Sequence, residues 1–508
     1  MKIFLWRSSR RSPPIMTKVG LRLRNCVSIM FKVKIADGKK KNGYIQLFFD
    51  SLVNVCANTT AHAIPNIIHT CETFIEYFQY PFTVHLNVYE KDLVDFPAVS
   101  ICNLNPFDTS KPHTLKYIKE KLAEKNLSTE VHGTDDLPAL YQVRQAMKVL
   151  KASEMYDRDV NKSFLEYDMG FKLDDMLISC YFNGERCDTT NFTTFFTFEY
   201  GNCFTYNKND FEHKIHKTSR SGPNSGLTLE LFTGFPGKQD LFLEKKGLYI
   251  VVHNNSYEPD VKFEGMKLPV GFSADVSVHR YFYNRLGPPY GSCKEDTSKS
   301  NEDDPEFYKA TIALGLYSRR ICLEICIQNL FIIPRCNCSD PSIPIVNNSY
   351  ILCHTMDEIN CIDKVRNELD TRDLSIDCDH ECPVDCNKID YEISTNFADY
   401  PSEYYFHTIE NQPNLSNKFK NFGNLTYSNF KQSVILLNVF YKDLAYSFLQ
   451  EIPSMHFADA IGIIGGQIGL FLGCSVLTFF EPLEVFIEVC YKLLTKPRKN
   501  IIQVKASI

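Results

Sequence analysis

AIGIIGGQIGLFLGCSVLTFF, residues 460–480, is the stretch that decides the fold class of this 508-residue chain. It carries no formal charge, and at 1.5 Å per helical residue it is long enough to cross a hydrocarbon core of about 30 Å. The stretch therefore predicts a transmembrane helix. It also contains five glycines, Gly462, Gly465, Gly466, Gly469 and Gly473. Because glycine weakens a helix interior, so many of them indicate either close helix packing in lipid or carbonyls that face a pore.

The triplet Gly473, Cys474 and Ser475 lies deep in this predicted span. A break in a helix at that depth is tolerated only where the backbone lines water or is buried in protein, and a narrow ion filter meets that condition. Beyond the span, the chain continues with Glu481, Glu484 and Glu488, which share one helical face. These carboxylates would either attract cations at the cytoplasmic mouth of a pore or belong to a solvated helix end.

Cysteines mark the part of the chain before this span. Fourteen of the nineteen lie between Cys102 and Cys386, and such a set either binds zinc in a reducing cytosol or forms disulfides in an oxidising compartment. The usual four-ligand zinc sets are not evident. Eight N-x-[ST] glycosylation acceptors favour the disulfide reading, and they begin at Asn126, Asn161, Asn191, Asn254, Asn337, Asn347, Asn414 and Asn424. We therefore expect an extracellular, disulfide-braced domain without a metal site.

Charge is distributed unevenly around a net value of −6. The first 41 residues are rich in Lys and Arg and contain one acid, Asp37, and the C-terminal tail is basic as well. Basic ends suit two cytoplasmic termini, although two disordered basic tails would have the same composition. Nucleic-acid binding is not favoured, because no recognition module accompanies the charges.

A second membrane segment is not evident. The best candidate, residues 64–84, carries His69, Glu72 and Glu76, which are costly at bilayer depth. The N-terminus lacks the apolar run of a signal peptide, because Arg7 interrupts it early. A glycosylated body must be translocated, so we expect that part of a first membrane span is missing, as in an exon-skipped isoform or a faulty gene model.

Several motifs resemble, in order, those of the degenerin/epithelial sodium channel (DEG/ENaC) family. They are FPAVSICNLNPF at 96–107, GNCFTYN at 201–207, GLTLEL at 226–231, PPYGSC at 288–293 and GGQIGLFLGCS at 465–475. The resemblance covers about residues 58–490. It implies an α+β membrane protein with a large, disulfide-rich and β-rich extracellular domain on two transmembrane helices per subunit, in a trimer.

The resemblance also implies domain boundaries and disulfide pairs. The expected domains are a cytoplasmic region at 1–63, a truncated first transmembrane region at 64–79, an extracellular domain at 80–457, a transmembrane pore helix at 458–489 and a cytoplasmic tail at 490–508. By resemblance to the acid-sensing branch, the expected pairs are Cys102–Cys203, Cys180–Cys187, Cys293–Cys386, Cys322–Cys382, Cys326–Cys378, Cys336–Cys361 and Cys338–Cys353.

Carried over residue by residue, the family pattern assigns the selectivity filter to Gly473, Cys474 and Ser475. It assigns gating roles to His62 and Ala63 in the cytoplasm, to Gly462 in the pore helix, and to Tyr80 and Tyr290 as two aromatic rings that pack at the wrist.

Three departures from the family pattern affect these roles. Ala63 stands where the family has glycine, Ile463 stands where acid-sensing relatives have a pore-mouth aspartate, and few residues separate His62 from Tyr80. At 1.5 Å per residue this interval reaches only about 25 Å, whereas relatives have a complete apolar helix there.

The function implied is an amiloride-sensitive, sodium-selective channel subunit that moves sodium passively across the plasma membrane. Its expected partners are sodium ions, membrane lipid and other subunits in a homo- or hetero-trimer, without a cofactor. The alternatives are a non-conducting or regulatory subunit that lacks a complete first helix, and an adhesion or receptor ectodomain on one anchor. An enzyme is not favoured, because no GxSxG, HExxH or P-loop spacing is present. The acidic run 301–306 (NEDDPE) would bind protons or calcium if it folded against other carboxylates, and otherwise forms a solvated loop.

Overall fold

The computed structural model describes residues 63–125, 139–160, 169–210, 214–237, 243–315, 317–344, 350–370, 378–412, 419, 425–472 and 486–487. The chain divides into two compact units. The larger unit is Val84–Glu451, and the smaller one joins the segments on either side of it. The extracellular domain expected at 80–457 contains the whole of the larger unit.

The first β-sheet of the larger unit is built around two long strands, β12 and β14. In the described residues it is a seven-stranded sheet with the order β13-β12-β14-β9-β4-β5, and β1 pairs with β14. Its strands are β13 (Asn387–Asp399), β12 (Phe272–Asn284), β14 (Val434–Pro453), β9 (Leu227–Phe232), β4 (Leu177–Phe182), β5 (Glu185–Arg186) and β1 (Phe82–Tyr89). Alternate residues of β12, Ala274, Val276 and Val278, are fully buried, which is the period of two that a strand requires. β12 pairs antiparallel with β13 and parallel with β14.

The second sheet is antiparallel and has the order β11-β10-β3-β7-β6. Its strands are β11 (Met266–Pro269), β10 (Gly247–His253), β3 (Ala98–Asn103), β7 (Gly201–Tyr206) and β6 (Phe192–Thr197), and β2 (Val94–Asp95) forms a small ribbon with β8 (Lys217–Thr218). Every residue of β3, β7 and β10 is buried. One apolar core joins the two sheets and includes Ile101, Leu229, Val276 and Leu437. The motifs at 96–107 and 201–207 therefore contribute to the centre of the fold.

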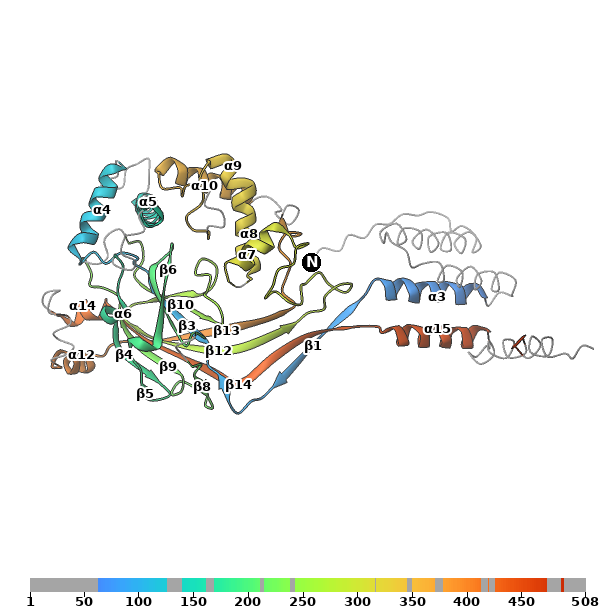
Figure 1. Ribbon diagram of the computed structural model, residues 1–508. Helices are drawn as coiled ribbons and strands as arrows, with labels where there is room; N and C mark the ends of the chain where they lie inside the picture. Colours follow the sequence, from blue (N-terminus) through green and yellow to red (C-terminus); the bar gives the residue numbers. More distant parts are fainter. Residues whose placement is uncertain are drawn as a thin grey trace, which may run out of the picture. The chain divides into compact units, whose positions relative to one another are not determined.

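Helices cover the sheets (Figure 1). They are α4 (Pro112–Glu124), α5 (Ala139–Val160), α6 (Leu173–Met176), η1 (Thr189–Asn191), α7 (Glu306–Ala313), α8 (Arg319–Ile327), η2 (Gln328–Ile332), α9 (Ile333–Cys336), α10 (Met356–Leu369), α12 (Glu403–Glu410) and α14 (Tyr427–Lys431). The start of α10 shows why a helix forms there, because Thr355 and Glu358 make a reciprocal capping box. Its residues Ile359, Ile362 and Val365 recur at helical spacing and are buried in a core shared with α5 and α8.

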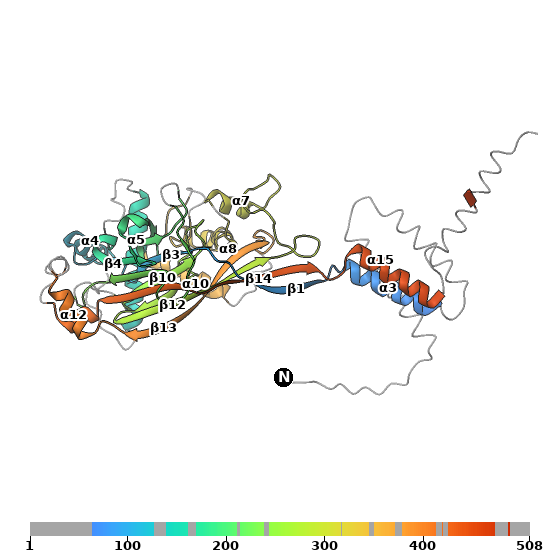
Figure 2. The same cartoon turned by 90° about the horizontal axis from the view of Figure 1, so that it is seen from below.

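The smaller unit contains two helices that pack side by side, α3 (Ala63–Phe78) and α15 (Phe457–Leu472), as Figures 1 and 2 both show. The amide of Gln467 donates to the hydroxyl of Thr73 at 3.1 Å. The rings of Tyr77 and Phe457 lie 6.1 Å apart. In the described segments, no helix reaches the length and apolarity that a bilayer crossing requires.

Candidate functional site

The predicted filter and part of the predicted gate cannot be placed. Gly473, Cys474, Ser475 and His62 lie outside the described residues. Ala63 is the first residue of α3, and Gly462 lies within α15. A Cβ atom added at Gly462 would have no atom within 4 Å. A larger side chain there would therefore not clash within a single chain.

α15 presents apolar side chains outward. Ile461, Ile463 and Leu470 are 51%, 42% and 81% exposed, while the polar Gln467 contacts Thr73 on α3. The Thr73 hydroxyl also donates to the carbonyl of His69 at 2.9 Å. This pairing was not predicted from the sequence. The available signal was one amide in an otherwise apolar segment, since polar groups in such segments commonly bind a neighbouring helix.

Tyr80 and Tyr290 occupy turns in different units. Tyr80 follows α3 with a φ of 49°, and its ring lies 6.2 Å from that of Tyr77 and 6.4 Å from that of Phe78. A positive φ is uncommon for a residue with a side chain, so the backbone turns sharply here. Tyr290 lies in a turn in which its backbone amide donates to the carbonyl of Gly287 at 3.1 Å. The packing of Tyr80 on Tyr290 stays a prediction.

Seven disulfides brace the larger unit. They join Cys102 to Cys203, Cys180 to Cys187, Cys293 to Cys386, Cys322 to Cys382, Cys326 to Cys378, Cys336 to Cys361, and Cys338 to Cys353. These are the pairs that the resemblance implies. Five of them lie within residues 293–386, where they tie α8 to the segment that precedes β13 and tie α9 to α10. Because cross-links restrict the unfolded chain, they stabilise a region that has little sheet structure of its own.

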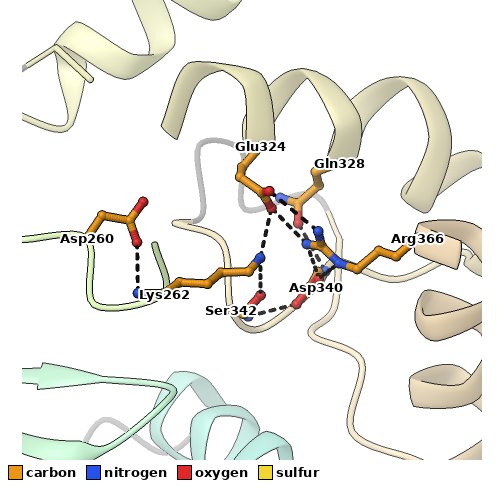
Figure 3. A network of polar contacts seen from close by, with 7 residues as sticks. All are labelled: Asp260, Lys262, Glu324, Gln328, Asp340, Ser342 and Arg366. Atoms are coloured by element: carbon orange, nitrogen blue, oxygen red, sulfur yellow. Dashed lines mark hydrogen bonds and ion pairs between the residues drawn. The ribbon is translucent and has the colours of Figure 1, made fainter. Parts of the chain in front are cut away.

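An ionic network holds the same helices together (Figure 3). The guanidinium of Arg366 on α10 lies 2.8 Å from Glu324 on α8 and 2.7 Å from Asp340. The ammonium of Lys262 also contacts Glu324, at 2.9 Å, and Gln328 accepts from the Asp340 backbone amide at 3.0 Å. Although burial opposes ionisation, the adjacent Arg366 holds the pKa of Asp340 below its usual range. Asp340 is therefore held in its ionised form, and the network links two helices with the loop between them.

The acidic run at 301–306 does not gather other carboxylates around Asp304. The carboxylate of Asp304 lies 2.5 Å from the ammonium of Lys294 and also accepts from the backbone amide of Asn301 at 2.7 Å. These hydrogen bonds, that of the backbone amide first, lower the pKa of Asp304. Of the two readings of this run, the structure therefore favours a loop, here leading into α7, over a cluster of coupled acids.

Comparisons with known proteins give consistent matches. The profile of the family described as "Amiloride-sensitive sodium channel" matches residues 59–485. The chain is 26% identical over 436 residues to the bile acid-sensitive ion channel of Homo sapiens, which covers 83% of this chain and 79% of the relative. It is 27% identical over 428 residues to acid-sensing ion channel 1C of Danio rerio, covering 81% of this chain and 74% of the relative. Among solved structures, a cryo-EM structure of a proton-activated chloride channel aligns with 87% of this chain and 99% of its own, at 7% identity and a TM-score of 0.31.

Proposed function

Because the chain belongs to the amiloride-sensitive sodium channel family, we propose that it is a subunit of a trimeric, sodium-selective and amiloride-sensitive channel of the plasma membrane. The resemblance of its motifs to the DEG/ENaC family is thereby confirmed, and members of that family are ion channels, not enzymes. The family match carries the proposal, since it covers α3, the whole disulfide-braced unit and α15.

In this proposal, Gly473, Cys474 and Ser475 form a narrow ring contributed by three subunits. Their backbone and hydroxyl oxygens would replace part of the hydration shell of sodium, which is how rings of oxygens select ions. Gly462 lies on α15, eleven residues before Gly473 in the chain. A bulky residue at Gly462 meets open space within one chain, so its effect on gating would arise between subunits.

A test of the filter measures reversal potentials in sodium and potassium. In a conducting assembly, Ser475→Ala and Gly473→Cys should each change the sodium-to-potassium permeability ratio, because the first removes a hydroxyl oxygen from the ring and the second adds a side chain that narrows it. Ser318→Ala, at the start of α8 in the larger unit, is the matched control and should leave the ratio unchanged. An unaltered ratio in both filter variants would reject this assignment.

A second candidate function is a regulatory subunit that does not conduct alone. The observation that favours it is the helix α3, which has 16 residues and therefore extends only about 24 Å. It also carries Glu72 and Glu76, both of which are exposed.

Expression of the chain with and without an inserted segment separates the two functions. Inserting the apolar segment of a close relative between His62 and Tyr80 should restore glycosylation and amiloride-sensitive sodium current if the short helix is the limitation. The unmodified chain should then alter the current of a co-expressed relative without producing one itself. Robust current from the unmodified chain would show that residues 64–84 suffice to cross the membrane.

A further inference from the structure

The larger unit contains a cavity of about 380 Å³ that the conduction role does not use. It lies between α5 and α10 on one side and the β10–β11 pair on the other, and it includes residues from the loop between β6 and β7. One wall carries part of the network of Figure 3, namely Lys262, Asp340, Ser342 and Arg366. This volume is within the range of small-molecule binding sites in proteins.

The interior of the cavity is largely apolar. Met147 of α5, Phe198 and Leu104 contribute to its lining, together with Ile359 and Ile362 of α10. Ile359 and Ile362 are almost completely buried, at 5% exposed each, whereas Leu104, Met147 and Phe198 are half-buried, so these three supply the apolar floor that a ligand can cover. Such a floor favours a ligand with an apolar body, because burial of apolar surface is favourable by about 25 cal/mol per Å². A small inorganic ion would leave this surface uncovered.

Basic side chains outnumber carboxylates in the lining of the cavity. Seven basic side chains take part, Arg144, Lys148, Lys151, Lys245, Lys262, Lys267 and Arg366, against the four carboxylates Glu199, Glu244, Asp340 and Asp363. Four of the cations each have a carboxylate nearby, as with Lys148 and Asp363 at 2.7 Å or Lys151 and Glu199 at 3.1 Å. The excess positive charge is therefore carried by the other three.

Those three cations are Arg144, Lys245 and Lys267. Arg144 and Lys245 share a single carboxylate, Glu244. Their hydrogen bonds, that of Arg144 first, lower the pKa of Glu244 to about 2, so this carboxylate is ionised and compensates one charge only. Lys267 on β11 is exposed, and its side chain forms no ion pair or hydrogen bond with any described residue. Together they place about two uncompensated positive charges beside an apolar floor.

We propose that this cavity binds a small organic anion, with its apolar body against Leu104, Met147 and Phe198 and its carboxylate or sulfonate at Lys245 and Lys267. A ligand in this position would contact α5, which Lys148 and Asp363 link to α10. The proposal concerns the larger unit alone and does not depend on ion conduction.

Photolabelling of the full-length, detergent-solubilised chain tests the proposal directly. The probe is 4-benzoylbenzoate, which combines an aromatic body with one carboxylate, and its neutral amide is the control ligand. Peptide mass spectrometry should locate the label on segments that line the cavity. Label elsewhere only, or equal labelling by acid and amide, would overturn the proposal.

Two variants establish whether the cations are responsible. In Lys245→Gln/Lys267→Gln, the concentration of probe for half-maximal labelling should rise roughly tenfold, since each exposed charge contributes modestly to binding. Lys119→Gln, on the exposed side of α4, should label as the unmodified chain does. Non-reducing peptide mapping confirms that the seven disulfides are intact in each variant. Equal labelling of a correctly cross-linked double variant and the unmodified chain would also overturn the proposal.

Discussion

At the scale of single residues, two family-like motifs contain a glycine that the backbone requires. Gly201 opens GNCFTYN with a φ of 66°, and Gly226 opens GLTLEL with a φ of 100°. A Cβ atom would lie 2.9 Å from the carbonyl oxygen of Pro106 at the first position and 2.3 Å from that of Val439 at the second. Both glycines therefore permit a strand to begin against backbone that a side chain would displace.

Replacement of Gly226 should consequently destabilise the larger unit. Gly226→Ala adds both an unfavourable φ and a contact with a carbonyl oxygen, so we expect the free energy of unfolding to fall by roughly 2–4 kcal/mol. Gly184→Ala is the matched control, because Gly184 has a φ of 87° but open space around its Cβ, and it should cost about 1 kcal/mol. Thermal unfolding measures how much stability each variant loses. Equal losses in the two variants would contradict the steric explanation.

A buried histidine makes stability depend on pH. His253 is 1% exposed, and its Nε2 lies 2.8 Å from the Ser100 hydroxyl while Nδ1 lies 2.9 Å from the Asn254 carbonyl. Burial lowers the pKa of His253 from 6.5 to about 4. Between these two values the unfolded chain binds a proton that the native chain does not, so stability should fall as the pH decreases from about 6.5 to 4, by up to about 3 kcal/mol.

The variant His253→Gln isolates this contribution. Its stability should change less between pH 7 and pH 5 than that of the unmodified chain, as measured by thermal unfolding at each pH. His380→Gln is the control, since the side chain of His380 is 68% exposed, and it should retain the original pH dependence. Parallel stability curves for the His253 variant and the unmodified chain would disprove the assignment.

At the scale of helices, α8 and α10 are joined by disulfide-bonded segments and by the partly buried Arg366, whose side chain is 25% exposed. The side chains of Glu324 and Asp340 are only 13% and 6% exposed, and Arg366 contacts both. Removal of one member of such a group leaves an uncompensated charge in a poorly hydrated site, which is costly. The network is therefore more sensitive to single substitutions than the surface ion pairs nearby.

Arg366→Met should lower the free energy of unfolding by about 3 kcal/mol, because two carboxylates lose their shared guanidinium. The chain offers a matched control in Arg335, whose ion pair with Glu368 at 2.8 Å is exposed on both sides. Arg335→Met should cost less than about 1 kcal/mol. Chemical denaturation measures the free energy of unfolding of both variants. Similar decreases in the two would show that burial of the network has no energetic consequence.

At the scale of the whole molecule, strand β1 presents an apolar stripe that no described part of the chain covers. Val84, Leu86 and Val88 alternate along the strand and are 55%, 61% and 64% exposed. Alternate residues of a strand lie on one face, so the three side chains form a row. Exposed rows of this kind mark contact surfaces between proteins, and the proposed trimer would supply the partner.

Leu86→Glu should therefore reduce assembly, because a charge in a subunit contact is left without a partner. Light scattering coupled to size-exclusion chromatography should show a shift from trimers toward monomers. Asn87→Glu introduces the same charge on the opposite face of β1 and is the control. If the two variants assemble equally well, the stripe is not part of the subunit contact.

The sequence alone was sufficient for the family, the α+β class and, by resemblance, the seven cysteine pairs, because each depends on residue types in a fixed order. The sequence also encodes short-range features such as the capping box of Thr355 and Glu358, because the two residues lie close together in the chain. The predicted filter and domain boundaries stay predictions. Apart from these cysteine pairs, contacts between distant segments could not be derived in this way, because no local pattern fixes them.

Only the tertiary structure brought Thr73 to Gln467, and Arg366 to Glu324 and Asp340. The cavity is a further example, since its lining extends from Leu104 to Arg366. The physical reason is the sheet topology, in which β12 pairs in parallel with β14, so that Ser273 lies opposite Leu436. Such pairings fix which helices meet over the sheets, and the periodicity of a single segment does not encode its partner.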